Sequence, residues 1–302
     1  MTTLGLDIGG TRLRIARVAA DGGIEARGGA PSLRDPQAVL DRCLDLIAQV
    51  RSAGVTAIGI GVPGEVEPWS RRVTSGGYVD FSGMDFAGEV ERRAGLPVVI
   101  ENDGTMALLG EAACGAARGC ANVVMLTIGT GIGGAVLNGG QILRGRGSAG
   151  QLGHLAVDRP GRPCMCGRTG CVETVSSGTA FGVHLAEAGL PAGTRAEDLL
   201  ARGDAVARGV IAAWALPLRA AIDSLIAVCN PQLVVIGGGA GAGAVAALAR
   251  FPARKSWFDA PVVLAELGED AGVVGAAMAG LAQGGLAQPG LAQGGFGPKA
   301  GI

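Results

Sequence analysis

Apolar and alternating stretches near the N-terminus predict three short strands joined by glycine turns. The stretches lie at residues 4–8, 13–19 and 24–29. Residues 9–11 (GGT) and 21–23 (DGG) between them supply the backbone freedom and the polar side chains that tight turns need. The chain therefore opens as strand, turn, strand, turn, strand.

Helical periodicity alternates with strand patterns in the residues that follow. Asp35 is a suitable N-cap and Pro36 a suitable first residue for a helix to about Ala53, in which the apolar side chains form one stripe. Further strands are predicted at residues 55–61, 97–100, 122–128, 135–138 and 233–236, and further helices at residues 85–94, 103–117, 177–188, 205–229 and 271–283. This order predicts an α/β protein built of packed layers.

A second unit of strand, glycine turn and strand at residues 122–138 repeats the order of residues 4–29. The repetition indicates two α/β domains with a cleft between them. We expect residues 1–118 to form the first domain and residues 119–283 the second, with the last helix able to pack back on the first domain. Residues 284–302 form a glycine-rich near-repeat, which we expect to be a flexible tail.

Composition indicates a folded chain without a nucleic-acid or membrane surface. Hydrophobic residues make up 48% of the 302 residues and charged residues 17%, so a packed core is expected rather than disorder. The net charge of −1 gives no reason to expect nucleic acid or membrane as a partner. The apolar run at residues 233–249 contains five glycines, which predict a strand, a turn and a helix start rather than a bilayer span. No basic segment precedes Asp7, so we expect no secretory signal and a cytoplasmic location.

One stretch, residues 142–173, gathers metal-binding side chains at the spacing H-x9-C-x-C-x4-C. The four are His154, Cys164, Cys166 and Cys171. Burial of a polar histidine and of ordinary core cysteines is the alternative, but three cysteines interleaved with Pro, Gly and Arg are not a core pattern. One His and three Cys can complete a tetrahedral zinc site, and four protein ligands leave no open position for water. We therefore expect a structural zinc.

Two glycine turns are candidates for phosphate binding. Gly9 and Gly10 let backbone N–H groups approach a phosphate closely, and Thr11 adds a hydroxyl donor. Asp7 beside them can hold a hydrated Mg²⁺, although an ordinary hairpin turn is the alternative. Residues 129–134 fit G-x-G-x-x-G, but they precede a strand and lack the acidic residue of a dinucleotide site. We interpret them as a second phosphate-facing turn opposite the first.

Asn102 and Asp103 follow directly on a predicted buried strand. Open α/β sheets place their ligand crevice at the carboxyl ends of such strands. Asp103 is therefore a candidate general base within reach of a substrate hydroxyl, with Asn102 fixing the acceptor. Capping of the following helix is the alternative role of the carboxylate.

Together these motifs resemble the ROK family of repressors, open reading frames and sugar kinases, within the actin/hexokinase-like ATPase fold. The resemblance covers about residues 4–283, and its motifs come in a fixed order. They are DIGGT (7–11), GVPG (61–64), END (101–103), GTGIGG (129–134), GQLGH (150–154), CMCGRTGCVE (164–173), VVIGGG (234–239) and LGEDAGVVGAA (267–277).

The resemblance implies an ATP-dependent carbohydrate kinase in which Asp103 deprotonates a sugar hydroxyl, usually the 6-hydroxyl, for attack on the γ-phosphate. It further implies that one nitrogen of His154 binds zinc while the other faces the sugar, that the cleft closes over the substrate, and that the chain forms a homodimer. The implied sugar contacts are Gly64, Asn102, Asp103, Gln151, His154 and Glu173. The implied contacts to the nucleotide and its phosphates are Asp7, Gly9, Gly10, Thr11, Thr130, Gly131, Gly238 and Gly239.

Three residues depart from the pattern of most sugar-kinase members. Gln151 stands where they carry Glu, and a carboxylate accepts from two sugar hydroxyls whereas Gln offers one acceptor and an NH₂ donor. Gly77 stands near a loop position where relatives often place a polar sugar contact. Arg12 replaces the commoner Lys. The base and phosphate motifs are intact, so an active enzyme is expected.

Three alternatives stay open. The first is a kinase whose acceptor is not glucose, such as N-acetylmannosamine, allose or fructose. The second is a non-catalytic sugar-sensing protein, which Gln151 favours and the intact Asn102-Asp103 pair disfavours. The third is polyphosphate as donor, which the cysteine cluster disfavours. A repressor is not expected, because DIGGT begins at residue 7 and leaves no room for a preceding helix-turn-helix domain.

Overall fold

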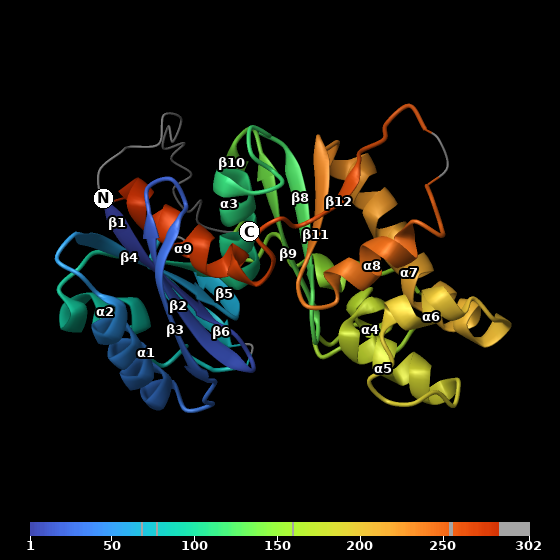
Figure 1. The fold of residues 1–302 in the computed structure, drawn as a ribbon, viewed down its shortest axis with the longest axis horizontal. Coiled ribbons are helices and arrows are strands. Elements are labelled where there is room, and N and C mark those ends of the chain that lie inside the picture. Colours follow the sequence, from blue (N-terminus) through green and yellow to red (C-terminus); the bar gives the residue numbers. More distant parts are fainter. Residues whose placement is uncertain (68, 77, 159, 254–255, 284–302) are drawn as a thin grey trace, which may run out of the picture.

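The computed structural model describes residues 1–67, 69–76, 78–158, 160–253 and 256–283, which form two lobes (Figure 1). Each lobe is built on a five-stranded mixed sheet with helices packed on it, so the predicted α/β class is confirmed. Gly77 and the predicted tail lie outside the described residues.

The N-terminal lobe contains the predicted strand–turn–strand–turn–strand opening. Its elements are β1 (Thr2–Ile8), β2 (Arg12–Ala19), β3 (Ile24–Pro31), α1 (Pro36–Val50), β4 (Val55–Val62), β5 (Gly64–Glu67), β6 (Arg72–Gly76), α2 (Phe86–Ala94), β7 (Val98–Asn102) and α3 (Asp103–Cys114). The sheet has the order β3-β2-β1-β4-β7, antiparallel from β3 to β1 and parallel from β1 to β7. Leu4, Leu6 and Ile8 alternate along β1 into a core that α1 and α2 cover.

The C-terminal lobe repeats this sheet. The elements that follow along the chain are β8 (Val123–Ile128), β9 (Ile132–Asn138), β10 (Gln141–Ile142), η1 (Leu152–His154), α4 (Glu173–Ser176), α5 (Gly178–Glu187), α6 (Ala196–Arg202), α7 (Ala205–Cys229), β11 (Leu233–Gly237), α8 (Gly241–Leu248), β12 (Val262–Leu264), η2 (Gly268–Asp270) and, back on the first lobe, α9 (Ala271–Gln283). The order β10-β9-β8-β11-β12 has the same strand directions as the first sheet. The repeated sequence pattern is thus a repeated topology, while domain limits at residues 118 and 283 stay a prediction.

Helix α9 leaves the second lobe and packs on β1, β4 and α3 of the first (Figure 1). The contact is made backbone to backbone at glycines. A Cβ atom on Gly59 of β4 would lie 1.7 Å from the carbonyl oxygen of Ala276, and one on Gly275 would lie 1.7 Å from that of Met106. Glycine at these positions is what lets the last helix approach the sheet and α3 so closely.

Buried Glu111 on α3 fixes the segment through which the chain returns to the first lobe. Its carboxylate is fully buried and accepts hydrogen bonds from the backbone N–H groups of Ala116 (2.8 Å), Glu266 (3.1 Å) and Leu267 (2.8 Å). Glu266 and Leu267 lie between β12 and η2. A buried carboxylate that accepts several N–H groups is well satisfied, so Glu111 holds α3 and this crossing segment together.

Helix α7 is, within the described ranges, the one helix long and apolar enough by length and composition to cross a bilayer. Half of its most apolar window is buried inside the protein. Trp214, Leu218 and Ile222 on this helix lie in the core of the C-terminal lobe. Core packing therefore accounts for its hydropathy.

The structure differs from the sequence predictions mainly at element ends. The first predicted helix ends at Val50 rather than near Ala53, and the helix predicted to reach residue 117 ends at Cys114. The strand predicted from residue 135 begins at Ile132, because the glycine turn itself pairs with β8. The short elements β5, β6, β10, β12, α4 and α6 were not predicted, since so few residues carry little periodicity.

Candidate functional site

The carboxyl end of β7 presents Asn102 and Asp103 at the start of α3. Asn102 is the N-cap of α3: its side-chain oxygen accepts the N–H groups of Gly104 (2.9 Å) and Thr105 (3.3 Å). Its amide nitrogen donates to the carbonyl of Gly64 at 2.8 Å, where a φ of +104° favours glycine. Because Asn102 caps the helix, the capping role considered for Asp103 is taken by its neighbour.

Asp103 has the acidity expected of a general base that works near neutral pH. Its carboxylate accepts the Gly104 N–H at 2.8 Å. Burial, followed by the negative charge of Asp7, raises the pKa of Asp103 to about 6, and its hydrogen bonds only partly oppose this. A base is most effective when its pKa lies close to the working pH. The influence of Asp7 also shows that the structure brings the two predicted carboxylates near one another.

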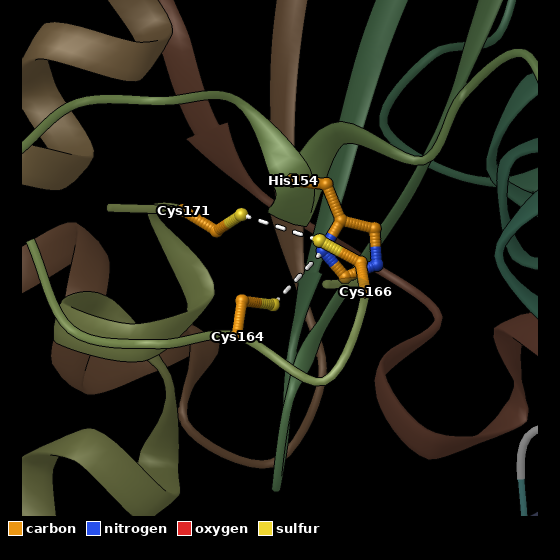
Figure 2. A group of neighbouring side chains, drawn as sticks. All are labelled: His154, Cys164, Cys166 and Cys171. Atoms are coloured by element: carbon orange, nitrogen blue, oxygen red, sulfur yellow. Dashed lines mark hydrogen bonds between the residues drawn. The ribbon is translucent and has the colours of Figure 1, made fainter. Parts of the chain in front are cut away.

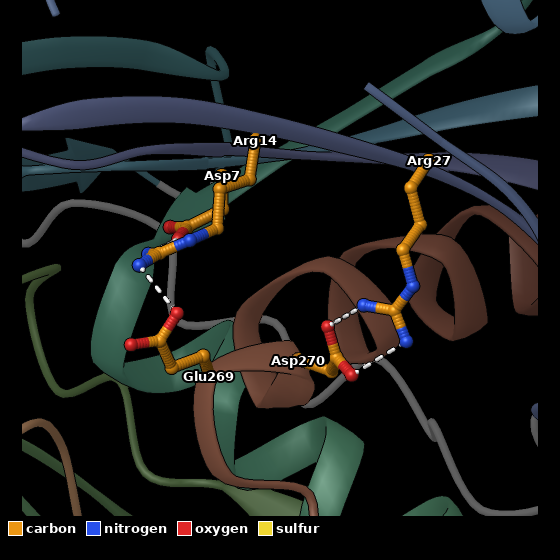
Figure 3. A network of polar contacts seen from close by, with 5 residues as sticks. All are labelled: Asp7, Arg14, Arg27, Glu269 and Asp270. Atoms are coloured by element: carbon orange, nitrogen blue, oxygen red, sulfur yellow. Dashed lines mark hydrogen bonds and ion pairs between the residues drawn. The ribbon is translucent and has the colours of Figure 1, made fainter. Parts of the chain in front are cut away.

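Asp7, at the end of β1, lies in a network of charges that Figure 3 shows. Arg14 of β2 contacts Asp7 at 3.5 Å and Glu269 at 3.1 Å. Burial raises the pKa of Asp7, and Arg14 opposes that effect. Beside this trio, Arg27 forms a two-pronged ion pair with Asp270, the last residue of η2. Both pairs tie the start of α9 to the first sheet.

The start of α9 also approaches Asp7 directly. A Cβ atom on Gly272 would lie 3.1 Å from the carboxyl carbon of Asp7. The positive end of a helix dipole stabilises negative charge at such a position. With Arg14 on one carboxylate oxygen, the other is left for a hydrated Mg²⁺, which proteins commonly hold through one or two carboxylates and substrate phosphates. The residues present therefore fit the ion.

The predicted phosphate residues form turns in both lobes. Gly9, Gly10 and Thr11 join β1 to β2, and the Gly9 N–H bonds back to the Arg12 carbonyl at 3.1 Å. In the second lobe, Thr130 and Gly131 join β8 to β9.

A third turn, at Gly238 and Gly239, follows β11 and adjoins the second. The Ala240 N–H donates to the Ile128 carbonyl at 2.9 Å, which places this turn beside the end of β8. Gly238 has a φ of +83°. The structure thus brings the two turns of the C-terminal lobe together at one end of its sheet.

Glu173 connects the predicted sugar wall to the second phosphate turn. One carboxylate oxygen, Oε2, accepts the Ile132 N–H at 2.8 Å. A Cβ atom on Gly131 would lie 2.3 Å from the same oxygen, so any larger residue at 131 would displace the carboxylate from this position. Within the described residues the other oxygen, Oε1, has no hydrogen-bond partner. Glu173 can therefore hold the turn with one oxygen and offer the other to a ligand.

The four predicted metal ligands come together in one group, as Figure 2 shows. Their ligand atoms all lie within 4.8 Å of one another. Cys164 Sγ is 3.5 Å from His154 Nδ1, and Cys166 Sγ is 3.6 Å from Cys171 Sγ. Tetrahedral zinc with ordinary bond lengths would separate S from N by about 3.6 Å and S from S by about 3.8 Å. These two separations match a zinc site, so the group is compatible with a bound zinc ion.

His154 and Gln151 occupy the short η1 segment that precedes the cysteines. His154 turns Nδ1 toward Cys164, which leaves Nε2 free of partners among the described residues. Gln151 is the exposed residue before η1, and its side-chain amide makes no capping bond. Both side chains thus have polar atoms available to a ligand.

A profile of the ROK family matches residues 3–283 of the chain. The chain belongs to the ROK family. The glucokinase of Streptomyces coelicolor is 32% identical over 309 aligned positions, which cover 91% of this chain and 96% of that enzyme. The N-acetylmannosamine kinase of Escherichia coli is 34% identical over 292 positions, covering 92% and 98%.

Structural comparison agrees with the sequence. The crystal structure of a ROK family glucokinase from Streptomyces griseus in complex with glucose and AMPPNP superimposes with a TM-score of 0.81 at 29% identity. The superposition covers 93% of this chain and 99% of that one. The predicted actin/hexokinase-like fold of this ROK protein is confirmed.

Sequence reasoning missed three charged residues of this ROK protein that join distant segments of the chain. Arg14 contacts Asp7, Glu269 contacts Arg14, and Glu111 bonds the crossing segment. The alternation of β2 places Arg14 on the face opposite buried Leu13 and Ile15. Its partner Glu269 lies 255 residues away. No local pattern predicts a pair so far apart in sequence.

Proposed function

We propose that this ROK protein transfers the γ-phosphate of ATP to a hexose or N-acylhexosamine, at the 6-hydroxyl, with Asp103 as general base. The observation that carries the proposal is Asp103 itself, a half-buried carboxyl with a pKa of about 6 at the end of β7 and close to Asp7. Membership of a family that includes glucokinases and N-acetylmannosamine kinases supports the reaction class.

In this reaction the protein mainly positions the reactants and stabilises charge. Asp103 accepts the proton of the sugar hydroxyl as the oxygen attacks the γ-phosphate. We assign the turn of Gly9, Gly10 and Thr11 and the turn of Thr130 and Gly131 to the phosphates, and Gly238-Gly239 to the nucleotide. In the first turn Gly10 and Thr11 would donate, because the Gly9 N–H is bonded to the Arg12 carbonyl. Bound with ATP beside Asp7, Mg²⁺ would neutralise charge on the β- and γ-phosphates. Closure of the two lobes would exclude water from the transfer.

The sugar would lie between the two lobes, in contact with residues from both. Asn102 and Gly64 are already joined by a hydrogen bond, which fixes both relative to Asp103. From the second lobe we assign Gln151, His154 Nε2 and the second oxygen of Glu173 as sugar contacts. The NH₂ group of Gln151 can donate to an acyl carbonyl, so the residue suits an N-acylhexosamine better than a carboxylate would.

Zinc held by His154, Cys164, Cys166 and Cys171 would fix the sugar-facing wall rather than take part in the chemistry. The spacing of the four ligand atoms supports this assignment. Ligation at Nδ1 fixes the tautomer and the orientation of His154, so that Nε2 presents N–H toward the sugar.

An ADP-release assay over a panel of hexoses and N-acetylhexosamines tests the reaction. We expect turnover with at least one sugar and a sugar 6-phosphate by phosphorus NMR. Asp103→Asn should lower kcat by about 10²–10⁴-fold while the circular dichroism spectrum is kept. Gln151→Glu should shift the ratio of kcat/KM from N-acetylhexosamine toward glucose. Turnover of Asp103→Asn near that of the wild type would exclude it as the base.

A non-catalytic sugar-sensing protein is the alternative, since Gln151 replaces the glutamate of most kinases. Sugar binding by calorimetry without ADP release for any sugar of the panel would establish it. Polyphosphate in place of ATP belongs in the same assay as a donor control. The homodimer, the absence of nucleic-acid and membrane partners, and the cytoplasmic location stay part of the proposal.

A further inference from the structure

Arg144 organises the glycine-rich loop that leads to Gln151. Its backbone carbonyl accepts two hydrogen bonds, from the N–H groups of Gly147 at 2.8 Å and Ala149 at 3.2 Å. The preceding Leu143 N–H bonds to Val136 of β9 at 2.8 Å, which attaches the start of the loop to the second sheet. The loop of residues 144–150, here the 144–150 loop, is therefore folded around the backbone of Arg144.

The side chain of Arg144 crosses from the second lobe to the first. Its Nε donates to Oε1 of Glu101 at 2.6 Å. Glu101 lies on β7, two residues before Asp103, and its side chain is only 13% exposed, against 35% for Arg144. An ion pair this short and this well shielded is screened less by solvent than a surface pair. It links the strand that leads to the base to the loop that leads to Gln151.

The other end of the loop is fitted to the same strand-and-helix junction through Gly134 of β9. A Cβ atom on Gly104, the residue after Asp103, would lie 2.9 Å from the Gly134 carbonyl oxygen. A Cβ atom on Gly150, the residue before Gln151, would lie 3.2 Å from that oxygen. Gly134 therefore packs between the residue after the base and the residue before Gln151, and the ion pair joins the same two segments through side chains.

Three glycines in the 144–150 loop increase the entropy cost of ordering it, and the Arg144–Glu101 ion pair can offset that cost. Gly145, Gly147 and Gly150 all have positive φ, at 56°, 120° and 95°. Glycine-rich segments lose much conformational entropy on ordering, and two backbone bonds offset little of it. The shielded ion pair of Arg144, the residue around which the loop folds, is suited to offset the rest of this entropy cost.

We propose that Arg144 is a positioning residue for the acceptor sugar, whose ion pair with Glu101 fixes the 144–150 loop, and with it Gln151, relative to Asp103. The sugar-positioning part rests on the proposed function; the ordering of the loop does not.

The expected effect is on geometry and not on the acidity of the base. Burial and Asp7 are the main causes that raise the pKa of Asp103, and Arg144 is not among the groups that shift it. Removal of Arg144 should therefore leave the pH midpoint of activity unchanged. It should raise KM for the sugar, because a misplaced loop weakens sugar contacts before and during transfer, and leave KM for ATP within about twofold.

Hydrogen exchange of the full-length protein without sugar tests the loop directly. The amides of residues 147 and 149 should exchange about tenfold faster in Arg144→Gln and in Glu101→Gln, because their shared acceptor loses its anchor. The double variant should exchange no faster than either single variant. Unchanged exchange in both single variants would overturn the proposal.

Steady-state kinetics with the best sugar of the panel test the positioning role. We expect sugar KM to rise roughly tenfold in each single variant and no further in the double variant. Arg144→Lys should recover part of the loss, since it restores the charge. If the two effects multiply in the double variant, the residues act independently and the pair does not position the sugar.

A matched control separates this pair from ion pairs in general. Arg93 contacts Asp41 at 2.9 Å between α2 and α1, and both side chains are more exposed than those of Arg144 and Glu101. Arg93→Gln should change neither loop exchange nor sugar KM. If the wild type phosphorylates no sugar, the proposed function fails, and the exchange experiment still decides whether the pair orders the loop.

Discussion

Asp103 carries the chemistry of the proposed reaction, and its acidity predicts how activity depends on pH. Burial and then the Asp7 carboxylate raise its pKa to about 6. A base must be ionised to accept a proton, so kcat/KM should fall about tenfold per pH unit below about 6 and level off above it. A profile between pH 4.5 and 8.5 with a midpoint near 4 would contradict the assignment.

The same raised pKa has the opposite consequence for stability. Between about 3.8 and 6 the folded state binds the Asp103 proton more tightly than the unfolded chain does, so stability contributed by this group falls as pH rises through that window. Asp103→Asn cannot ionise and can still accept the Gly104 N–H. Urea unfolding should find the inactive variant more stable than wild type by about 1–3 kcal/mol at pH 8, with the difference vanishing near pH 4.

The sequence allowed two roles for Asp103, and the structure shows why a pattern could not choose between them. A general base and a helix N-cap can both be an Asp at the end of a buried strand, so the sequence pattern is the same for the two roles. Asn102 caps the helix through the N–H groups of Gly104 and Thr105, and Asp103 shares only the first of them, through Oδ1. The surroundings that set its pKa come from β1 and the buried interior, which local sequence does not describe.

At the scale of elements, the cysteine segment has little regular structure of its own to hold it. Its backbone pairing consists of isolated bridges, Ala156 to Cys171 and Pro163 to Thr169. We therefore expect purified protein to contain about one zinc per chain, and Cys166→Ser to lose it together with roughly 5 °C or more of Tm. Metal content by mass spectrometry and thermal scans measure both.

Cys229, at the end of α7 and outside the cluster, provides the control for this experiment. Cys229→Ser should keep the zinc. Sugar affinity should fall in the metal-free protein, because His154 loses the ligation that orients Nε2. Metal-free protein that binds sugar as tightly as wild type would contradict the role of zinc in shaping the wall.

This element was the most predictable part of the site. Four ligands within eighteen residues are a local signal, and their spacing alone predicted the group that the structure brings together. The 144–150 loop is the opposite case. Its sequence shows glycines and two arginines, but nothing in it identifies Glu101, 43 positions earlier, as the partner of Arg144. Contacts between the lobes depend on how the whole chain folds, so the sequence of neither segment alone predicts them.

For the whole molecule, the repeated strand and turn pattern predicted two similar sheets, and their common topology follows from it. The return of α9 to the first lobe was foreseen only as an option. The glycines that allow the close packing of α9 lie within ordinary strand and helix patterns. An isolated glycine in such a pattern usually indicates lower stability of the strand or helix. Gly59 and Gly275 are instead points of backbone contact, which appear only once the helix is placed against the sheet and α3.

This close packing predicts a large loss of stability from a single methyl group. In Gly275→Ala, the new Cβ would lie 1.7 Å from the Met106 carbonyl oxygen and 2.6 Å from the Gly110 nitrogen. Both atoms belong to the backbone of α3, so no side-chain rotation relieves the clash. We expect urea unfolding to show a loss of about 3 kcal/mol or more, or no folded protein at all.

Gly182→Ala on α5 is the matched control, because it makes the same change in a helix where no atom lies within 4 Å of the new Cβ. There alanine should stabilise the protein by up to about 1 kcal/mol, through its better helix propensity. If both variants gain stability, α9 does not approach α3 as closely as the structure shows. If Gly275→Ala alone is destabilised, the last helix of the chain holds the first lobe together, and the fold requires the return of α9 from the second lobe.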